Sequence, residues 1–348
     1  MNLAPLPSLL KRLAAHSLFS PVAALLLLLI ISTAVNPNFL RIIWLDGHLS
    51  GNLIDVLNRA APLILVSVGM MLVIAARGLD ISVGAIVAIT GAVAALITSS
   101  SFTSTHAGLL PLMAAITGAL AIAALCGLWN GLLVVKTGMQ PIIATLILMV
   151  AGRGIAQLIT DGQIITIYYE PYYYIGNGFL LGIPFALIVA LLTAVGLHLL
   201  LTRTALGLFI RAIGLNPIAA HVAGVRSRMI TMCLYVFCGF SAGLAGLIIS
   251  SNVKSADGNN AGQLMELDAI LAVTLGGTAL TGGRFTVIGT VIGALIIQTL
   301  TSMIYSSGLP PQVNLAVKAV LVFAVMLLQS NEFRSAVREL IFKSKVTS

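Results

Sequence analysis

A succession of apolar stretches, each long enough to cross a lipid bilayer, constrains this chain more than any other feature. A spanning helix needs about 20 mostly apolar residues. Charged residues make up only 8% of the sequence and hydrophobic residues 59%, whereas a soluble domain carries about 25% charged residues. The sequence therefore predicts an all-α integral membrane protein, with residues 1–348 as a single polytopic domain. Ten candidate spans stand out, at roughly 17–35, 60–76, 83–99, 108–135, 140–160, 179–201, 229–251, 267–281, 287–306 and 315–330.

The basic residues orient these spans, because cytoplasmic loops of membrane proteins are enriched in Lys and Arg. With the N-terminus in the cytoplasm, thirteen Lys and Arg residues fall on the cytoplasmic side, four fall outside, and only Arg153 lies within a span. We therefore expect both termini to be cytoplasmic. The N-terminal Lys11, Arg12 and following apolar run resemble a signal peptide, but no small-residue cleavage site stands out, so we interpret the run as a retained helix.

The longest internal cytoplasmic loop, at about 202–228, contains four arginines and no acidic residue. Asn216 is suited to cap a helix whose first turn contains Pro217, and Gly224 is suited to end it. This short helix has two interpretations. Its arginines could bind anionic lipid at the membrane surface, but its small residues, such as Ala219 and Ala220, favour insertion into a groove on another protein.

Several motifs resemble one family, the permeases of ribose/xylose/galactose-type sugar ABC importers, and the galactofuranose importers among them most closely. The loop matches the family's coupling segment through Gly207, Ala212, Gly214, Asn216, Ala219, Ala220 and Gly224. "RGLDISVGA" (77–85), "GLWNGLLV" (127–134), "PIIATLILMVAGRGIAQLIT" (141–160) and "LDAILAVTLGGTALTGGRFT" (267–286) follow in the family's order. Two residues depart from the pattern, since Arg77 and Phe285 stand where glycine is common.

The resemblance implies a permease subunit that moves a monosaccharide, in the furanose form for example, from periplasm to cytoplasm across the bacterial inner membrane. It implies an ABC ATPase that carries ATP and Mg²⁺, a second permease that is a paralogue or an identical copy, and a periplasmic sugar-binding protein, besides membrane lipid. No cofactor would be bound by this chain, and no nucleic acid or metal is implied. The residues expected to couple to the ATPase are Arg211, Ala212, Gly214, Asn216, Ala219, Ala220 and Gly224.

Polar residues inside the spans are the candidates for a sugar path, because buried hydroxyls need hydrogen-bonding partners. Arg153, Gln157 and Asp161 are spaced four apart, so a continuous helix would present them on one face. An alternative is that an Arg–Asp pair holds helices together. The full set of candidate path residues is Asn130, Arg153, Gln157, Asp161 and Thr274.

Each remaining polar candidate also has a structural interpretation. Asn130 could bond to neighbouring backbone in place of a sugar. Asp80 and Ser82 form a possible gate, but they are also suited to cap the third span. Thr274 and Thr278 could line the path or bond to carbonyls of their own helix.

Two outer features are equally open. The acids Glu266 and Asp268 could favour a helix N-terminus through its dipole or pair with a docked binding protein. The tyrosines of "IYYEPYYYIG" (167–176) could form an interfacial belt or a mouth that contacts sugar or a binding protein.

Other classes of function lack their required residues. No lysine follows a glycine in this sequence, so the phosphate-binding loop of ATPases is missing. Cys126, Cys233 and Cys238 have neither metal nor disulfide spacing. An ion-coupled secondary carrier remains the alternative, although it needs an ion-binding group near the midplane, and the acids lie near the ends of spans. A passive channel would leave the loop at 202–228 unexplained.

Overall fold

The protein was analysed as a computed structural model that describes residues 18–45, 47–101, 108–308, 310, 313–320 and 323. The chain divides into two compact units, residues 1–298 and 299–348. In chain order, the elements are α2 (Phe19–Val35), β1 (Ile43–Leu45), β2 (His48–Ser50), α3 (Asn52–Ala75), α4 (Val83–Ser101), α5 (Leu110–Val135), α6 (Pro141–Ile159), β3 (Ile165–Thr166), α7 (Glu170–Asn177), β4 (Phe179–Leu180), β5 (Ile183–Pro184), α8 (Phe185–Arg203), α9 (Leu206–Leu215), α10 (Pro217–Val222), α11 (Ser227–Val253), β6 (Ser255–Ala256), α12 (Met265–Leu275) and α13 (Val287–Ser306).

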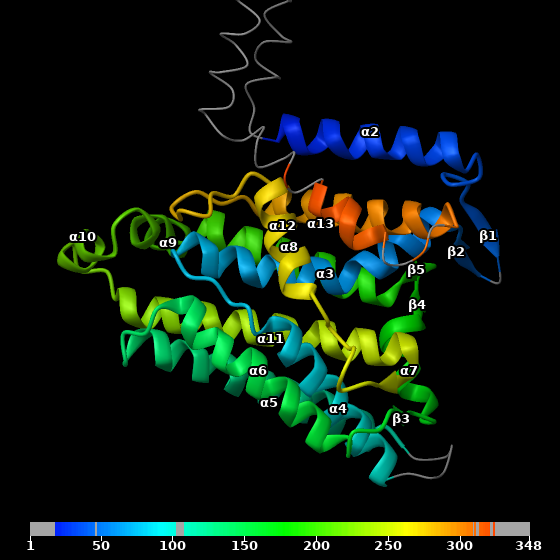
Figure 1. The fold of residues 1–348 in the computed structure, drawn as a ribbon, viewed down its shortest axis with the longest axis horizontal. Coiled ribbons are helices and arrows are strands. Elements are labelled where there is room, and N and C mark those ends of the chain that lie inside the picture. The colour runs from blue at the N-terminus through cyan, green and yellow to red at the C-terminus, as the bar shows by residue number, and fades with distance from the viewer. Residues whose placement is uncertain are drawn as a thin grey trace, which may run out of the picture. The chain divides into compact units, whose positions relative to one another are not determined.

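The core of the first unit is formed by helices that are apolar on every side. Every residue of α3 from Ala60 to Ala75 is buried, and α11 packs against α3, α4 and α5 (Figure 1). Small residues permit this close packing, as they commonly do between helices in lipid. Gly127 of α5 and Gly239 of α11 lie so close that a Cβ on Gly239 would stand 2.9 Å from the Gly127 Cα atom. A side chain at either position would push the two helices apart.

Within the described residues, six helices are long and apolar enough to cross a membrane: α3, α5, α6, α8, α11 and α13. The helices α2, α4 and α9 are also apolar, but they are shorter over the residues whose side chains are described. The predicted helical membrane architecture is therefore confirmed at this level. Of the predicted tenth span, 315–330, only 315–320 and 323 lie within the described residues, and these are helical. Lys11 and Arg12 lie outside the described residues.

Several predicted bounds were wrong. The predicted span at 267–281 is the eleven-residue α12, which ends at Leu275 because Gly276 and Gly277 follow it and Gly277 adopts a φ of +85°. At 1.5 Å per residue, α12 is about 16 Å long, roughly half the hydrocarbon thickness. The loop at 202–228 contains the unpredicted ten-residue α9 in addition to the short helix.

Short antiparallel ribbons were also unpredicted. The strand β1 pairs with β2, β3 with β6, and β4 with β5. In Figure 1, the β1–β2 and β4–β5 ribbons lie at one end of the first unit, and α9 and α10 lie at the opposite end. The two ends of the helices are therefore structurally distinct.

The second unit begins within α13. The described part of it contains the last residues of α13, 299–306, and a helical stretch at 313–320.

Candidate functional site

The short helix in the 202–228 loop begins as the sequence predicts. The Asn216 side-chain oxygen accepts hydrogen bonds from the backbone N–H groups of Ile218 and Ala219, both at 3.0 Å. Pro217 occupies the first helical position, where its missing N–H costs nothing. The helix α10 ends at Val222, and Gly224 follows it with a φ of +86°. The capping residues thus fix a compact bend between α9 and α11.

The outward face of α10 differs from the face that small residues suggested. Ala220 is only 5% exposed, because it turns toward the protein's own chain. Ile218 and Val222 are 76% and 83% exposed, and Ala219, Ala223 and Gly224 are exposed beside them. The surface that a partner would meet therefore carries bulkier apolar side chains than predicted, beside the exposed His221. We call it the α10 face: Ile218, Ala219, Val222, Ala223 and Gly224.

At the C-terminal end of α9, three distant segments of the chain meet. The Gly283 N–H donates to the Ala75 carbonyl at 2.9 Å. A Cβ added to Gly214 would overlap the Ala75 oxygen and the Gly283 nitrogen. Gly214 is therefore a packing residue that lets the end of α9 lie against the end of α3 and against the turn between α12 and α13.

Both departures from the family pattern contribute contacts at this junction. Arg77 donates from Nε to the Gly214 carbonyl and from Nη2 to the Leu215 carbonyl, each at 2.6 Å. Its φ of +65° lies in the left-handed region, where glycine would be unstrained. The guanidinium of Arg211 lies 5.2 Å from the centre of the Phe285 ring, within cation–π range. Glycine at either departure would form neither contact.

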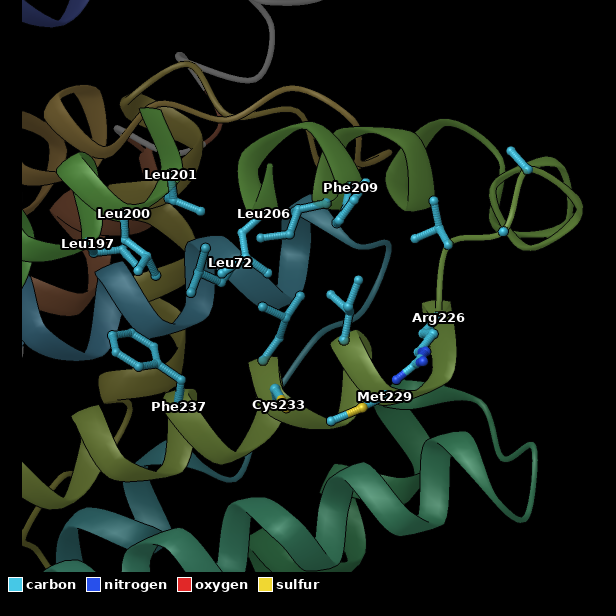
Figure 2. A pocket seen from close by; sticks show the side chains of 16 residues that line it. Leu72, Leu197, Leu200, Leu201, Leu206, Phe209, Arg226, Met229, Cys233 and Phe237 are labelled. Atoms are coloured by element: carbon cyan, nitrogen blue, oxygen red, sulfur yellow. The ribbon is translucent and has the colours of Figure 1, made fainter. Parts of the chain in front are cut away.

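An apolar cavity of about 690 Å³ lies beside this junction. Figure 2 shows side chains of α3, α8, α9 and α11 pointing into it, with Arg226 near the start of α11. Cys233, the exposed member of the three free cysteines, is part of its lining. The cavity leaves unfilled space between α9 and the spanning helices around it.

Asp80, Ser82 and Asn130 form a fully buried polar cluster. The Asp80 carboxylate accepts from the Ser82 N–H at 3.0 Å, from the Ser82 hydroxyl at 2.6 Å and from the Asn130 amide at 3.3 Å. The Asn130 amide also donates to Ser82 Oγ at 2.8 Å. All three side chains are 0% exposed. The expectation that Asn130 would bond to backbone was wrong, since its amide nitrogen ties α5 to the turn before α4.

Arg153 and Gln157 both reach the loop that precedes α12. Arg153 Nη1 donates to the Ala261 carbonyl at 2.5 Å and to the Asn259 carbonyl at 3.3 Å. Gln157 Nε2 donates to the Asn259 side-chain oxygen at 2.5 Å. Asp161 does not share their face, because α6 ends at Ile159 and Asp161 lies in the following turn with a φ of +50°. The predicted three-residue face was therefore wrong at its last member.

The two threonines of the 267–286 motif are also separated. Thr274 is 9% exposed, and its hydroxyl donates to the Leu271 carbonyl of its own helix at 3.0 Å. Thr278 lies beyond the end of α12 and accepts from the Thr286 N–H at 3.4 Å. The alternative of a bond to a carbonyl of the same helix is confirmed for Thr274, whereas the placement of Thr278 on that helix was wrong, because α12 ends at Leu275.

Most of the tyrosines in and around α7 contact other residues of this chain. Tyr172 is 0% exposed, and its hydroxyl lies 2.7 Å from Ser250 Oγ of α11. Lys254 lies 4.5 Å from the centre of the Tyr173 ring. Burial, with smaller contributions from Glu170 and Tyr168, raises the pKa of Tyr173, which keeps its hydroxyl protonated. Tyr168 and Tyr174, 79% and 46% exposed, are the exposed members of this cluster. Whether they form an interfacial belt or a mouth stays a prediction.

Of the two acids at the start of α12, Glu266 is not part of an open docking surface. Glu266 is 4% exposed, and a Cβ on Gly84 would overlap one of its carboxylate oxygens. Its place in the first turn of α12 fits stabilisation by the helix dipole. The alternative in which Glu266 pairs with a docked binding protein is contradicted by this burial, and the same alternative for the half-buried Asp268 stays a prediction.

Comparison with known proteins decides the family. Residues 52–328 match the family model described as "Branched-chain amino acid transport system / permease component". The chain belongs to this family. The permease is 48% identical over 317 residues to the galactofuranose transporter permease protein YtfT of Escherichia coli (strain K12). The aligned region covers 91% of each chain. No solved structure matches it.

Other relatives extend the match. The fructose import permease protein FruF of Bifidobacterium longum is 36% identical over 92% of this chain and 89% of its own. The ribose import permease protein RbsC of Bacillus subtilis is 39% identical over 88% of this chain and 91% of its own. These matches confirm the resemblance to sugar importer permeases. The permease is thus a multi-pass membrane transport subunit rather than a catalytic one.

Proposed function

We propose that this permease is the membrane subunit of an ATP-driven importer that moves a monosaccharide into the bacterial cytoplasm. The curated relatives named above transport galactofuranose, fructose and ribose by their names. A furanose is the favoured substrate, because the relative named for galactofuranose is 48% identical over 91% of the chain. Two permeases, preferably different paralogues, would enclose the path. Both termini would be cytoplasmic, with ten membrane segments of which α12 is a half-length one.

The observation that carries this proposal is the junction of α9 with two turns between spanning segments. An ATPase subunit carrying ATP and Mg²⁺ would dock on the α10 face. Movement of α10 would pull on Gly214, which packs against Gly283 in the turn between α12 and α13. The same movement would reach the turn between α3 and α4 through the hydrogen bonds of Arg77.

These two turns lead to the polar residues of the membrane interior. The turn after Arg77 leads directly to Asp80 and Ser82, which are bonded to Asn130. The turn at Gly283 leads back along α12 to the loop that Arg153 holds. A shift at α10 would therefore change both polar regions together. Because ATP binding favours one partner geometry, it would bias the permease between outward-open and inward-open states.

The test is ATPase binding by the full-length permease in detergent, with the ATPase co-expressed from a neighbouring gene. The double variant Ile218→Asp, Val222→Asp places two charges on the apolar α10 face and should lose the ATPase during copurification. The matched control is Leu181→Asp, which alters a residue 91% exposed in the β4–β5 turn, at the opposite end of the helices. The control should retain the ATPase.

Two results would contradict the proposal. Retention of the ATPase by the double variant would remove α10 from the contact. Failure of the native permease to bind any ATPase, with uptake that follows a proton gradient, would favour an ion-coupled carrier.

A further inference from the structure

The loop between α11 and α12 enters the depth of the membrane helices. Arg153, which donates to the carbonyls of Asn259 and Ala261, is the thirteenth of the nineteen residues of α6. At 1.5 Å per residue, it lies about 18 Å from one end of α6 and about 9 Å from the other. Gly258 packs on the backbone of Ala156, where a Cβ would stand 3.0 Å from the carbonyl carbon. The loop thus lies alongside α6 rather than beyond its end.

Deeper still is the second half of the loop. A Cβ on Gly84, at the start of α4, would overlap the Gly262 carbonyl. The depth of this part of α4 within the bundle follows from its contact with Gly152 of α6. A Cβ on Gly152 would lie 3.1 Å from the Cβ of Ala85. Gly152 is near the middle of α6. Gly262 is therefore close to the middle of the helix bundle's depth.

Amide side chains stand exposed on this loop: Asn259, Asn260 and Gln263. Some of their atoms are already bonded. The Asn259 side-chain oxygen accepts from Gln157, and the Asn260 amide nitrogen donates to Asp257 Oδ2 at 2.7 Å. Asp257 Oδ1 accepts from the backbone N–H groups of both asparagines, at 2.8 and 3.2 Å. The loop is therefore internally held, with its amides in fixed positions.

Donors and acceptors remain available on this surface. Among the described residues, neither the Asn259 amide nitrogen, nor the Asn260 side-chain oxygen, nor the Gln263 side chain has a hydrogen bond assigned to it. An amide exposed to lipid at this depth would cost several kcal/mol. These three side chains must therefore face water or another polar group when the permease is in a bilayer.

We infer that Asn259, Asn260 and Gln263, here called the amide face, contact the hydroxyls of the transported sugar and help to select it. A sugar hydroxyl both donates and accepts, and the free atoms of the amide face offer both functions without net charge. The nearby Arg153 donates to two carbonyls of the loop, and the side-chain atoms of the loop that remain without a partner belong to uncharged amides, which suit a neutral ligand. This inference rests on the proposed function and names a contact region for its substrate.

The experiment uses the complete transporter, permease pair, ATPase and purified binding protein, in proteoliposomes. Uptake of radiolabelled D-ribose, D-fructose and D-galactose is measured for the native complex and for Asn260→Ala and Gln263→Ala. Matched controls are Asn38→Ala and Gln163→Ala, which remove exposed amides from the turns after α2 and α6. Each variant is also measured for copurification of the ATPase and of the second permease.

Loss of one hydrogen bond to a sugar hydroxyl should lower the uptake rate roughly three- to tenfold. The loss should differ among the three sugars, so the order of preference changes, whereas a packing defect would lower all three alike. The controls should transport all three sugars as the native complex does. If Gln263→Ala does not accumulate in the membrane, Gln263→Asn, which shortens the side chain by one methylene, replaces it with the same expectation.

Three outcomes separate the explanations. Unchanged uptake and preference in both variants would overturn the inference. Loss of the second permease from either variant would overturn it too, because the amide face would then be a subunit contact. If the native complex transports none of the sugars and binds no ATPase, the proposed function fails instead.

Discussion

Replacing Arg77 by glycine or by alanine separates two opposing effects at one position. Both changes remove the hydrogen bonds from the guanidinium to the carbonyls of Gly214 and Leu215. Only glycine also relieves the left-handed backbone, whose φ is +65°. Both variants therefore lose the two hydrogen bonds, and only Arg77→Gly also relieves the backbone strain.

The magnitudes follow from the geometry. A hydrogen bond from a charged donor is worth roughly 1.5–3 kcal/mol when buried, and Arg77 is exposed, so we take roughly 1 kcal/mol for each bond. A left-handed conformation costs a residue with a Cβ about 1–2 kcal/mol. Replacement by glycine removes this strain, but the greater conformational freedom of glycine in the unfolded chain offsets about 0.5–1 kcal/mol of the gain. Arg77→Ala should thus cost about 2 kcal/mol and Arg77→Gly about 1 kcal/mol.

Two assays test the reasoning. Thermal unfolding in detergent should rank the melting temperatures as native, then Arg77→Gly, then Arg77→Ala. Stimulation of the partner ATPase by the loaded binding protein should fall alike in both variants, because both lose the link to α9. At Arg228, an exposed position in the first turn of α11, the order of the two substitutions should reverse, since alanine favours a helix over glycine.

Particular results would refute this account. Arg77→Ala at or above the melting temperature of Arg77→Gly would show that the backbone strain at this position is no larger than the roughly 0.5–1 kcal/mol that glycine loses through its freedom in the unfolded chain. Native stimulation of the ATPase in either variant would show that the two hydrogen bonds do not transmit movement.

Three further predictions concern the same regions. Gly214→Ala should destabilise the protein by about 1–3 kcal/mol and weaken ATPase stimulation, because the new methyl group would press on the backbone of Gly283; calorimetry and ATPase assays measure both. Asn130→Leu should lower the melting temperature, since it leaves a buried carboxylate short of a donor, at a cost of about 1–3 kcal/mol. A maleimide should modify Cys233 much faster than the buried Cys238 in intact protein, as mass spectrometry of peptides would report, and equal rates would contradict the cavity described beside α9.

Local sequence was enough to predict the start of α10. Asn216 and Pro217 satisfy the first turn of that helix by themselves, and Gly224 supplies the left-handed residue after it. Such features depend on neighbours within three or four residues. The long apolar helices are predictable for a similar reason, because hydrophobicity over 20 residues decides whether a segment enters lipid.

The errors concern features that depend on contacts between segments far apart in the sequence. Ala220 is buried and Ile218 exposed because α10 rests on its own chain, which hydrophobicity alone cannot reveal. The spacing of Arg153 and Asp161 predicted a shared face only while α6 was assumed to continue beyond Ile159. Asn259 lies in a loop without helical periodicity, so the sequence did not predict it as a sugar-path residue. Only its contact with α6 in the structure identifies it as a candidate.

The half-length α12 has a consequence for how the protein is made. Eleven residues preceded by a polar loop are too short to enter lipid as an independent span. Non-helical backbone at this depth is tolerated only when other protein surrounds it. The helices against which α12 packs, α3 and α4, are synthesised earlier in the chain. We therefore expect α12 to insert after these helices have packed. In a nascent chain paused between α11 and α12, the place of the loop and of α12 would be empty, and the Arg153 side chain would be exposed to the bilayer.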